Sequence, residues 1–253
     1  HEAGEYLIDG PTLLAEALDS GVNLDRVFVE SKSIDDAVID RARGVTRVRE
    51  VSDGTLAKVL DLVNPNGMVA VAKMGAAPLS SSPGLSDAIG GADLLLVLVD
   101  VADPGNVGTM LRAAEASGCA GVVVAGDSTD PFSPKVVRAS AGSLFRLPVH
   151  LAGDPVETLE SIRSVGLRAL ATVVGEGRAP EDIELCGSAI VIGNEAHGLD
   201  REIVDACDGT ITVPMTGRVE SLNAAMAATI VLFEAARQRR ASQLERAVSR
   251  VGS

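Results

Sequence analysis

Two hydrophobic patterns alternate along the chain after residue 92. Short apolar runs bounded by turn residues predict buried strands at 94–99, 121–125, 169–174, 189–192 and 210–213. Apolar residues at helical spacing predict helices at 107–117, 156–164, 201–207 and 224–240. Near-continuous apolar strands separated by helices are typical of a parallel sheet covered on both faces. We therefore predict an α/β domain with its ligand site at the carboxyl ends of the strands.

The first 74 residues show a shorter alternation of the same kind. The pattern predicts helices at 11–20, 34–43 and 56–62, and strands at 26–30, 46–51 and 68–72. The stretch that follows is uncharged and rich in Gly, Pro and Ser, which is typical of a linker. We expect a small α/β domain at 1–74, a linker at 75–91 and a second domain at 92–253.

Composition narrows the possible functions. The 253 residues include 22 Lys and Arg against 35 Asp and Glu, a net charge of −13, which argues against a broad basic face for nucleic acid. Positive charge is concentrated in residues 236–253, with five basic residues and one acidic. One Tyr, four Phe and no Trp argue against a base-stacking platform. No apolar run approaches the roughly 18–20 residues that a membrane-spanning helix needs.

The cysteines and histidines are few and scattered. Cys119, Cys186 and Cys207 stand far apart with no C-x-x-C pair, which argues against a disulfide framework or a zinc cluster. Three histidines leave little material for a histidine-rich metal site. We expect a cytoplasmic protein that needs no metal and does not associate with membranes.

A first polar block follows the strand predicted at 94–99. Asn106 can cap the next helix, and Arg112 lies off the buried stripe of that helix, so it can face the strand ends. The simpler alternative is that Asn106 is only a cap and Arg112 only a solvated charge. Only Gly105 and Gly108 match a dinucleotide fingerprint, which disfavours a nucleotide-dependent oxidoreductase.

Two further polar blocks follow later strands. In the first, Gly193 allows close backbone approach to a ligand, and the carboxylate of Glu195 needs a partner at a strand end. His197 is interpreted as a loop side chain. In the second, a polar loop follows Pro214, and Ser221 is the predicted cap of the last helix. Ordinary turns and caps are the simpler alternative for both blocks.

Taken together, the three blocks resemble the SpoU/TrmH family of RNA ribose 2′-O-methyltransferases, within the SPOUT class. The matching residues are Asn-Val-Gly-x-x-x-Arg at 106–112, Ile-Gly-Asn-Glu-x-x-Gly-Leu at 192–199 and Val-Pro-Met-x-Gly-x-x-Glu-Ser-Leu-Asn at 213–223. Residues 134–142 are also similar to a family segment. Residues 4–73 resemble the N-terminal substrate-binding domain of the family.

This resemblance implies a fold, a cofactor and a set of site residues. It implies a deep trefoil knot in the C-terminal domain, a homodimer formed through that domain, and S-adenosylmethionine as cofactor. The implied cofactor pocket consists of Thr172, Gly193, Val213 and Leu222. The implied catalytic residues are Asn106, Arg112, Glu195, Ser221 and Asn223.

The implied reaction is 2′-O-methylation of a ribose in RNA, with 23S ribosomal RNA favoured over transfer RNA. A non-catalytic RNA-binding or ribosome-assembly protein is the other alternative, but it would be expected to lose Arg112, Glu195 or Asn223, and all three are present. Because RNA is an anion, a local basic surface is expected. The candidates for it are Lys135, Arg138, Arg146, Arg218 and residues 237–240.

Overall fold

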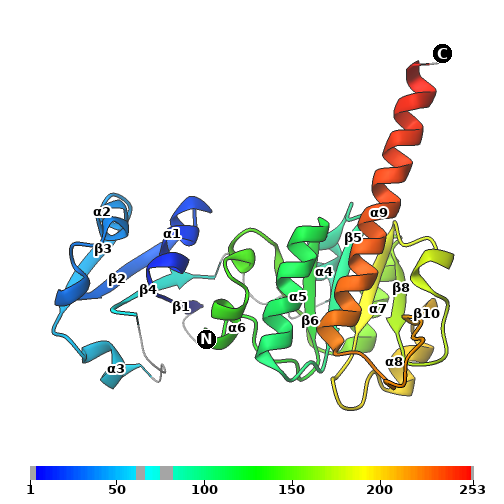
Figure 1. Cartoon of the computed structure of the whole chain (residues 1–253), viewed down its shortest axis with the longest axis horizontal. Coiled ribbons are helices and arrows are strands. Elements are labelled where there is room, and N and C mark those ends of the chain that lie inside the picture. Colours follow the sequence, from blue (N-terminus) through cyan, green and yellow to red (C-terminus); the bar gives the residue numbers. More distant parts are fainter. Residues whose placement is uncertain (1–3, 61–65, 75–81, 252–253) are drawn as a thin grey trace. The chain divides into compact units, whose positions relative to one another are not determined.

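The structure is a computed structural model that describes residues 4–60, 66–74 and 82–251, and it forms two compact units (Figure 1). Unit 1 comprises residues 1–77 and 130–146, and unit 2 comprises residues 78–129 and 147–253. Residues 130–146, which we expected in the second domain, therefore belong to the first unit.

Unit 1 is built on a four-stranded mixed sheet. Its strands, in sheet order, are β1 (Glu5–Asp9), β4 (Met68–Lys73), β2 (Leu24–Glu30) and β3 (Arg47–Val51). Strand β4 is antiparallel to β1 and β2, whereas β2 and β3 are parallel. The early part of the chain also forms helices α1 (Pro11–Asp19), α2 (Ala37–Arg43) and α3 (Thr55–Val59). Strand β1 was not predicted from the sequence.

The segment 130–146 joins unit 1 through side-chain contacts. Arg138, on helix α6 (Pro134–Ala139), forms an ion pair with the buried carboxylate of Asp9 at 3.0 Å. Arg146 pairs with Glu16 at 2.6 Å. The rings of Tyr6 and Phe132 also pack together, with their centroids 5.3 Å apart.

Unit 2 contains a six-stranded sheet in which every pairing is parallel, as predicted. Its strands, in sheet order, are β10 (Gly209–Ile211), β8 (Arg168–Thr172), β9 (Ser188–Ile192), β5 (Leu94–Val99), β6 (Gly121–Ala125) and β7 (Val149–Leu151). All six residues of β5 are buried, so helices cover both faces of the sheet at its centre.

The helices of unit 2 lie on the two faces of this sheet (Figure 1). They are α4 (Ser82–Ile89), α5 (Pro104–Ser117), α7 (Pro155–Ser164), α8 (Arg201–Asp205) and α9 (Ala224–Val251). Helix α5 packs against α9, and α4 packs against α7. No helix of the described chain combines the length and apolar character needed to cross a membrane.

Helix α4 occupies part of the expected linker. Its Leu85 and Ile89 are buried in one core cluster with residues of β5 and α7. Residues 82–89 are therefore an integral part of unit 2, because their apolar side chains leave water within its core. Residues 75–81 of the expected linker lie outside the described residues.

Candidate functional site

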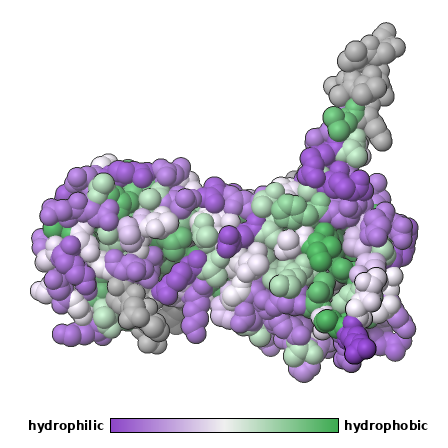
Figure 2. Space-filling model, in the orientation of Figure 1, coloured by the Kyte–Doolittle hydropathy of each residue, from purple (hydrophilic) through white to green (hydrophobic). Residues whose placement is uncertain are grey.

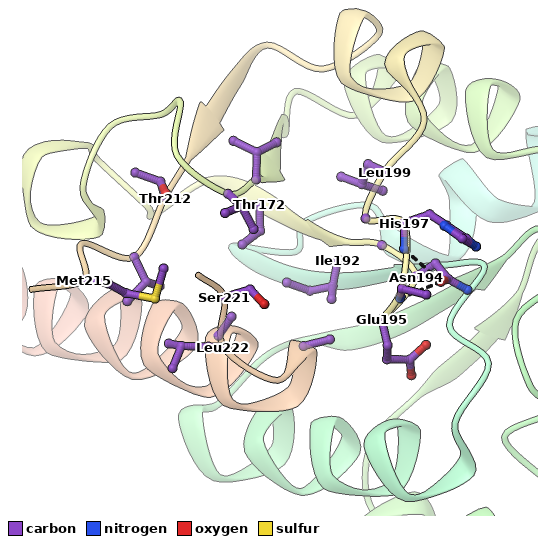
Figure 3. A pocket seen from close by; sticks show the side chains of 18 residues that line it. Thr172, Ile192, Asn194, Glu195, His197, Leu199, Thr212, Met215, Ser221 and Leu222 are labelled. Carbon is purple, nitrogen blue, oxygen red and sulfur yellow. Dashed lines mark hydrogen bonds between the residues drawn. The ribbon is translucent and has the colours of Figure 1, made fainter. Parts of the chain in front are cut away.

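The largest group of predicted site residues surrounds a cavity of about 400 Å³ in unit 2 (Figure 3). The cavity lies where β8, β9 and β10 end and α9 begins, at the carboxyl edge of the parallel sheet. Thr172, Gly193, Val213 and Leu222 all line it. Its size falls within the range of small-molecule and cofactor sites.

Thr172 provides a test of whether the cavity suits a polar ligand. Its hydroxyl oxygen is buried and has no hydrogen-bond partner within the described part of the chain. Buried polar groups nearly always have a hydrogen-bond partner. The unpaired Thr172 hydroxyl beside the cavity therefore fits a ligand that provides a hydrogen-bond donor or acceptor.

Gly193 also has a structural role within the chain itself. A Cβ added there would lie 2.4 Å from the backbone oxygen of Gly198. Asn194 and Gly198 also exchange two backbone hydrogen bonds. Gly193 is therefore required by the tight turn at 194–198, which itself forms one wall of the cavity.

Three predicted catalytic residues form one hydrogen-bonded cluster. The side-chain amide of Asn106 donates to Oε1 of Glu195 at 2.9 Å. Nδ2 of Asn223 donates to Oδ1 of Asn106, also at 2.9 Å. The cluster joins α5, the loop after β9 and the start of α9, three segments that are far apart in the sequence.

The carboxylate of Glu195 also fixes the start of the β5–α5 connection. It accepts hydrogen bonds from the backbone N–H groups of Ala102 and Asp103, each at 3.1 Å. Partial burial raises the pKa of Glu195, but the hydrogen bonds from Asn106 and from these amides lower it further. The net pKa lies below the usual value, so Glu195 is an anion at neutral pH and a hydrogen-bond acceptor rather than a base.

In the structure, helices α5 and α9 are capped by residues other than the two predicted ones. Helix α5 is capped by Asp103, whose Oδ1 accepts the Asn106 N–H at 2.7 Å, so Asn106 is not the cap. Helix α9 is capped by Asn223, whose Oδ1 accepts from the N–H groups of Ala225 and Met226. Ser221, the expected cap, is instead exposed and lines the cavity.

Arg112 is not part of this hydrogen-bonded cluster. It is exposed on α5, and within the described residues its side chain makes no hydrogen bond or ion pair. An exposed guanidinium with all five donors available is suited to binding a phosphate or an oxyanion.

Two residues near the cavity extend the predicted site. His197, interpreted as an ordinary loop residue, lines the cavity. Asn194 also lines it, and its side chain bonds to three backbone groups on two loops. Its position inside the Gly-Asn-Glu block was visible in the sequence, but its hydrogen-bond partners were not.

Several predicted RNA-binding cations already have partners. Arg138 and Arg146 pair with acidic residues, Arg237 pairs with Glu234, and Arg239 donates to the backbone oxygens of Ser117 and Gly118. Considering the described chain alone, the side chains of Lys135, Arg218 and Arg240 make no hydrogen bond or ion pair. Over the same residues, no group of three or more potential ligands is placed to hold a metal ion.

Comparison with known proteins adds independent information on both parts of the chain. Residues 93–233 match the SpoU rRNA Methylase family, and residues 1–70 match the MRM3-like substrate binding domain. The first match spans more than half of the chain.

Individual relatives and solved structures resemble the chain over most of its length. The 23S rRNA (uridine(2479)-2′-O)-methyltransferase of Streptomyces viridochromogenes is 38% identical, covering 94% of this chain and 84% of that protein. The 23S rRNA (guanosine-2′-O-)-methyltransferase RlmB of Xanthomonas axonopodis pv. citri is 33% identical, with 92% and 96% covered. The crystal structure of the SpoU methyltransferase AviRb from Streptomyces viridochromogenes, in complex with AdoMet, aligns with a TM-score of 0.82 and 31% identity, covering 94% of this chain and 91% of that one.

Proposed function

The chain belongs to the SpoU rRNA methylase family, and from this premise we propose that it transfers a methyl group from S-adenosylmethionine to a ribose 2′-hydroxyl of ribosomal RNA. The observation that carries the proposal is the cluster of Asn106, Glu195 and Asn223, which joins all three family blocks beside the cavity. Relatives named as 23S rRNA 2′-O-methyltransferases support ribosomal RNA over transfer RNA.

The cavity is the proposed cofactor site. Bound S-adenosylmethionine supplies a methyl group made electrophilic by a sulfonium. The hydroxyl of Thr172 would give a polar atom of the cofactor a buried partner. Gly193, Val213 and Leu222 would hold it from the strand and loop walls. The anionic Glu195, which also lines the cavity, favours a cationic ligand there.

Arg112 is the proposed contact to the reacting nucleotide. A ribose hydroxyl is a poor nucleophile until its proton leaves. An arginine guanidinium stays protonated in proteins, so it is poorly suited to take that proton. We assign Arg112 to binding the substrate phosphate and stabilising negative charge on the ribose oxygen, with proton transfer to a phosphate or water. Ser221 and Asn223, just before α9, would hold the ribose and phosphate.

The two units have different proposed roles. The MRM3-like match over residues 1–70 supports RNA recognition by unit 1, and the family match over 93–233 supports catalysis by unit 2. The deep trefoil knot stays a prediction. It is supported by family membership and by the all-parallel sheet. A cytoplasmic location is proposed from the RNA substrate and from three cysteines in free form.

A homodimer through unit 2 is supported by an apolar surface on α9. Met226, Ile230 and Phe233 recur at i, i+4 and i+7, and all three are exposed. Figure 2 shows apolar residues gathered over α9 where it crosses unit 2. The opposite face of the helix is buried through Ala228, Leu232 and their neighbours. A second copy of the same surface would remove these side chains from water.

The proposal is tested by incubating the protein with radiolabelled S-adenosylmethionine and two RNAs, 23S ribosomal RNA and bulk transfer RNA, each lacking 2′-O-methylation. We expect label in the ribosomal RNA, mapped to one 2′-O-methylated nucleotide. Label in transfer RNA alone would identify the alternative substrate. Cofactor binding measured by calorimetry without any methyl transfer to either RNA would contradict the proposed reaction.

A further inference from the structure

The carboxyl ends of three adjacent strands are joined by side-chain hydrogen bonds that begin at Asn194. Asn194 follows β9, and its Nδ2 donates to the backbone oxygen of Asp100, at the end of β5, at 2.8 Å. Oδ1 of Asp100 accepts in turn from the N–H of Asp127, just after β6, at 2.7 Å. The sheet order β9-β5-β6 makes this a continuous link across the strand ends.

The backbone at the end of β5 has little conformational freedom. Asp100 has a φ of 55°, in the left-handed region that non-glycine residues seldom adopt. A Cβ added to Gly126 would lie 2.2 Å from Oδ1 of Asp100. The backbone oxygen that Asn194 binds therefore belongs to a residue held from both sides.

The other end of the same side-chain amide shapes the cavity wall. Oδ1 of Asn194 accepts from the N–H of Ala196 at 2.8 Å and from that of His197 at 3.3 Å. Both residues line the cavity, and Figure 3 shows the Asn194 side chain turned towards His197. One amide thus uses its acceptor for the cavity wall and its donor for the β5–α5 connection.

Glu195, the residue after Asn194, connects the cavity wall to the start of α5. Its carboxylate binds the N–H groups of Ala102 and Asp103 and the side chain of Asn106. The hydrogen bond from Asn194 to Asp100 therefore helps to set the position at which α5 begins. The position of Arg112 on α5 follows from it. Displacement of catalytic groups by about 1 Å can lower a rate about 100-fold.

We infer that Asn194 is a positioning residue that couples the cofactor cavity to the catalytic helix α5, through a donor and an acceptor that can be separated by mutation. The inference rests on the proposed methyl transfer and goes beyond it. Loss of the donor should displace α5 but leave the cavity wall intact. Loss of both groups should impair the cavity as well.

The test compares Asn194→Asp with Asn194→Ala in the full chain, measuring S-adenosylmethionine affinity by calorimetry and methyl transfer at saturating RNA. Asp keeps an acceptor for Ala196 and His197 but, when ionised, has no donor for Asp100. We expect N194D to bind cofactor within about threefold of the wild type while kcat falls about 10- to 100-fold. N194A should lose cofactor affinity as well as rate. Gln243→Glu, which adds the same charge at an exposed position on α9, should match the wild type in both measurements.

A pH profile separates positioning from a general structural effect. When protonated, the carboxyl group introduced in N194D could again donate to the backbone oxygen of Asp100, which lies 2.8 Å from Nδ2 of Asn194 in the wild type. The N194D rate relative to the wild type should therefore rise as the pH falls from mildly alkaline to mildly acidic. Equal losses of cofactor affinity and rate in N194D, a wild-type rate, or a flat rate ratio would each overturn the inference. Inactive wild-type protein would instead contradict the proposed reaction itself.

Discussion

Arg112 and Asn106 lie six residues apart on α5, but only the side chain of Asn106 is fixed by hydrogen bonds. Asn106 has hydrogen-bond partners on two other segments, whereas the guanidinium of Arg112 is exposed and has no hydrogen bond or ion pair to the described residues. The sequence could identify both residues, because they belong to one family block. The sequence left open whether Glu195 would bind Asn106 or Arg112, because that choice depends on how β9 and β5 pair in the sheet.

The first residue-scale prediction concerns Arg112→Ala. Cofactor affinity should change little, because Thr172, Gly193 and Leu222 line the cavity and Arg112 does not. Methyl transfer should fall about 10²–10³-fold, as when one oxyanion stabiliser is removed. Arg112→Lys should recover little activity, because an ammonium lacks the planar fork of donors. Turnover near that of the wild type in Arg112→Ala, measured at saturating RNA, would exclude a catalytic role.

A second residue-scale prediction follows from the lowered pKa of Glu195. A carboxyl group whose folded pKa is below its unfolded value stabilises the fold above the unfolded pKa, and this contribution is lost as the pH falls through the folded pKa. The difference in thermal midpoint between the wild type and Glu195→Gln should therefore be largest at neutral pH and shrink in acid. A difference that is constant with pH would show that the charge of Glu195 is not what holds the loop.

At the scale of elements, most helices and strands were predicted from their apolar patterns, and a few were missed. Strand β5, with six consecutive apolar residues, could be recognised directly. Strands β1 and β7 were not predicted, although β6 and β10, which have the same lengths of five and three residues, were. Helix α4 was taken for linker because its Ser, Pro and Gly content hid the helical spacing of Leu85 and Ile89. Composition alone does not show that such residues reach a core.

Asn223 gives an element-scale prediction because it both caps α9 and binds Asn106. Asn223→Ala should lower the free energy of unfolding by about 1 kcal/mol through the lost cap and should also reduce methyl transfer. Asn223→Asp keeps the cap but loses the donor to Asn106. Its free energy of unfolding in urea should match that of the wild type, whereas its rate of methyl transfer should be reduced. Equal activity of Asn223→Asp and the wild type would show that the bond to Asn106 is dispensable.

Helix α4 can be tested in the same way. Leu85 is buried in the core of unit 2, so Leu85→Ala should lower the free energy of unfolding by about 2–5 kcal/mol. Asp87→Ala, at an exposed position on the same helix, should have little effect. Urea unfolding of the two variants distinguishes a core helix from a linker, in which both substitutions would be neutral.

At the scale of the whole molecule, the chain passes between its two units more often than the sequence indicated. Residues 130–146 lie within the matched methylase region but belong to unit 1. Their attachment depends on pairs such as Asp9 with Arg138, which are 129 residues apart. No local pattern reveals such a pair, so the sequence placed a single boundary where the structure has a discontinuous unit.

The final prediction concerns assembly through α9. Ile230 and Phe233 are 44% and 45% exposed, so replacing either with Asp removes little from the core of unit 2. If their surface is the contact between two copies, burying a charge there without a partner is unfavourable. Sedimentation at micromolar concentration should show the wild type as a dimer and Phe233→Asp as a monomer. Val59→Asp, at a 72% exposed apolar position in unit 1, should remain dimeric. A wild-type monomer, or a Phe233→Asp dimer of undiminished affinity, would contradict assembly through this surface.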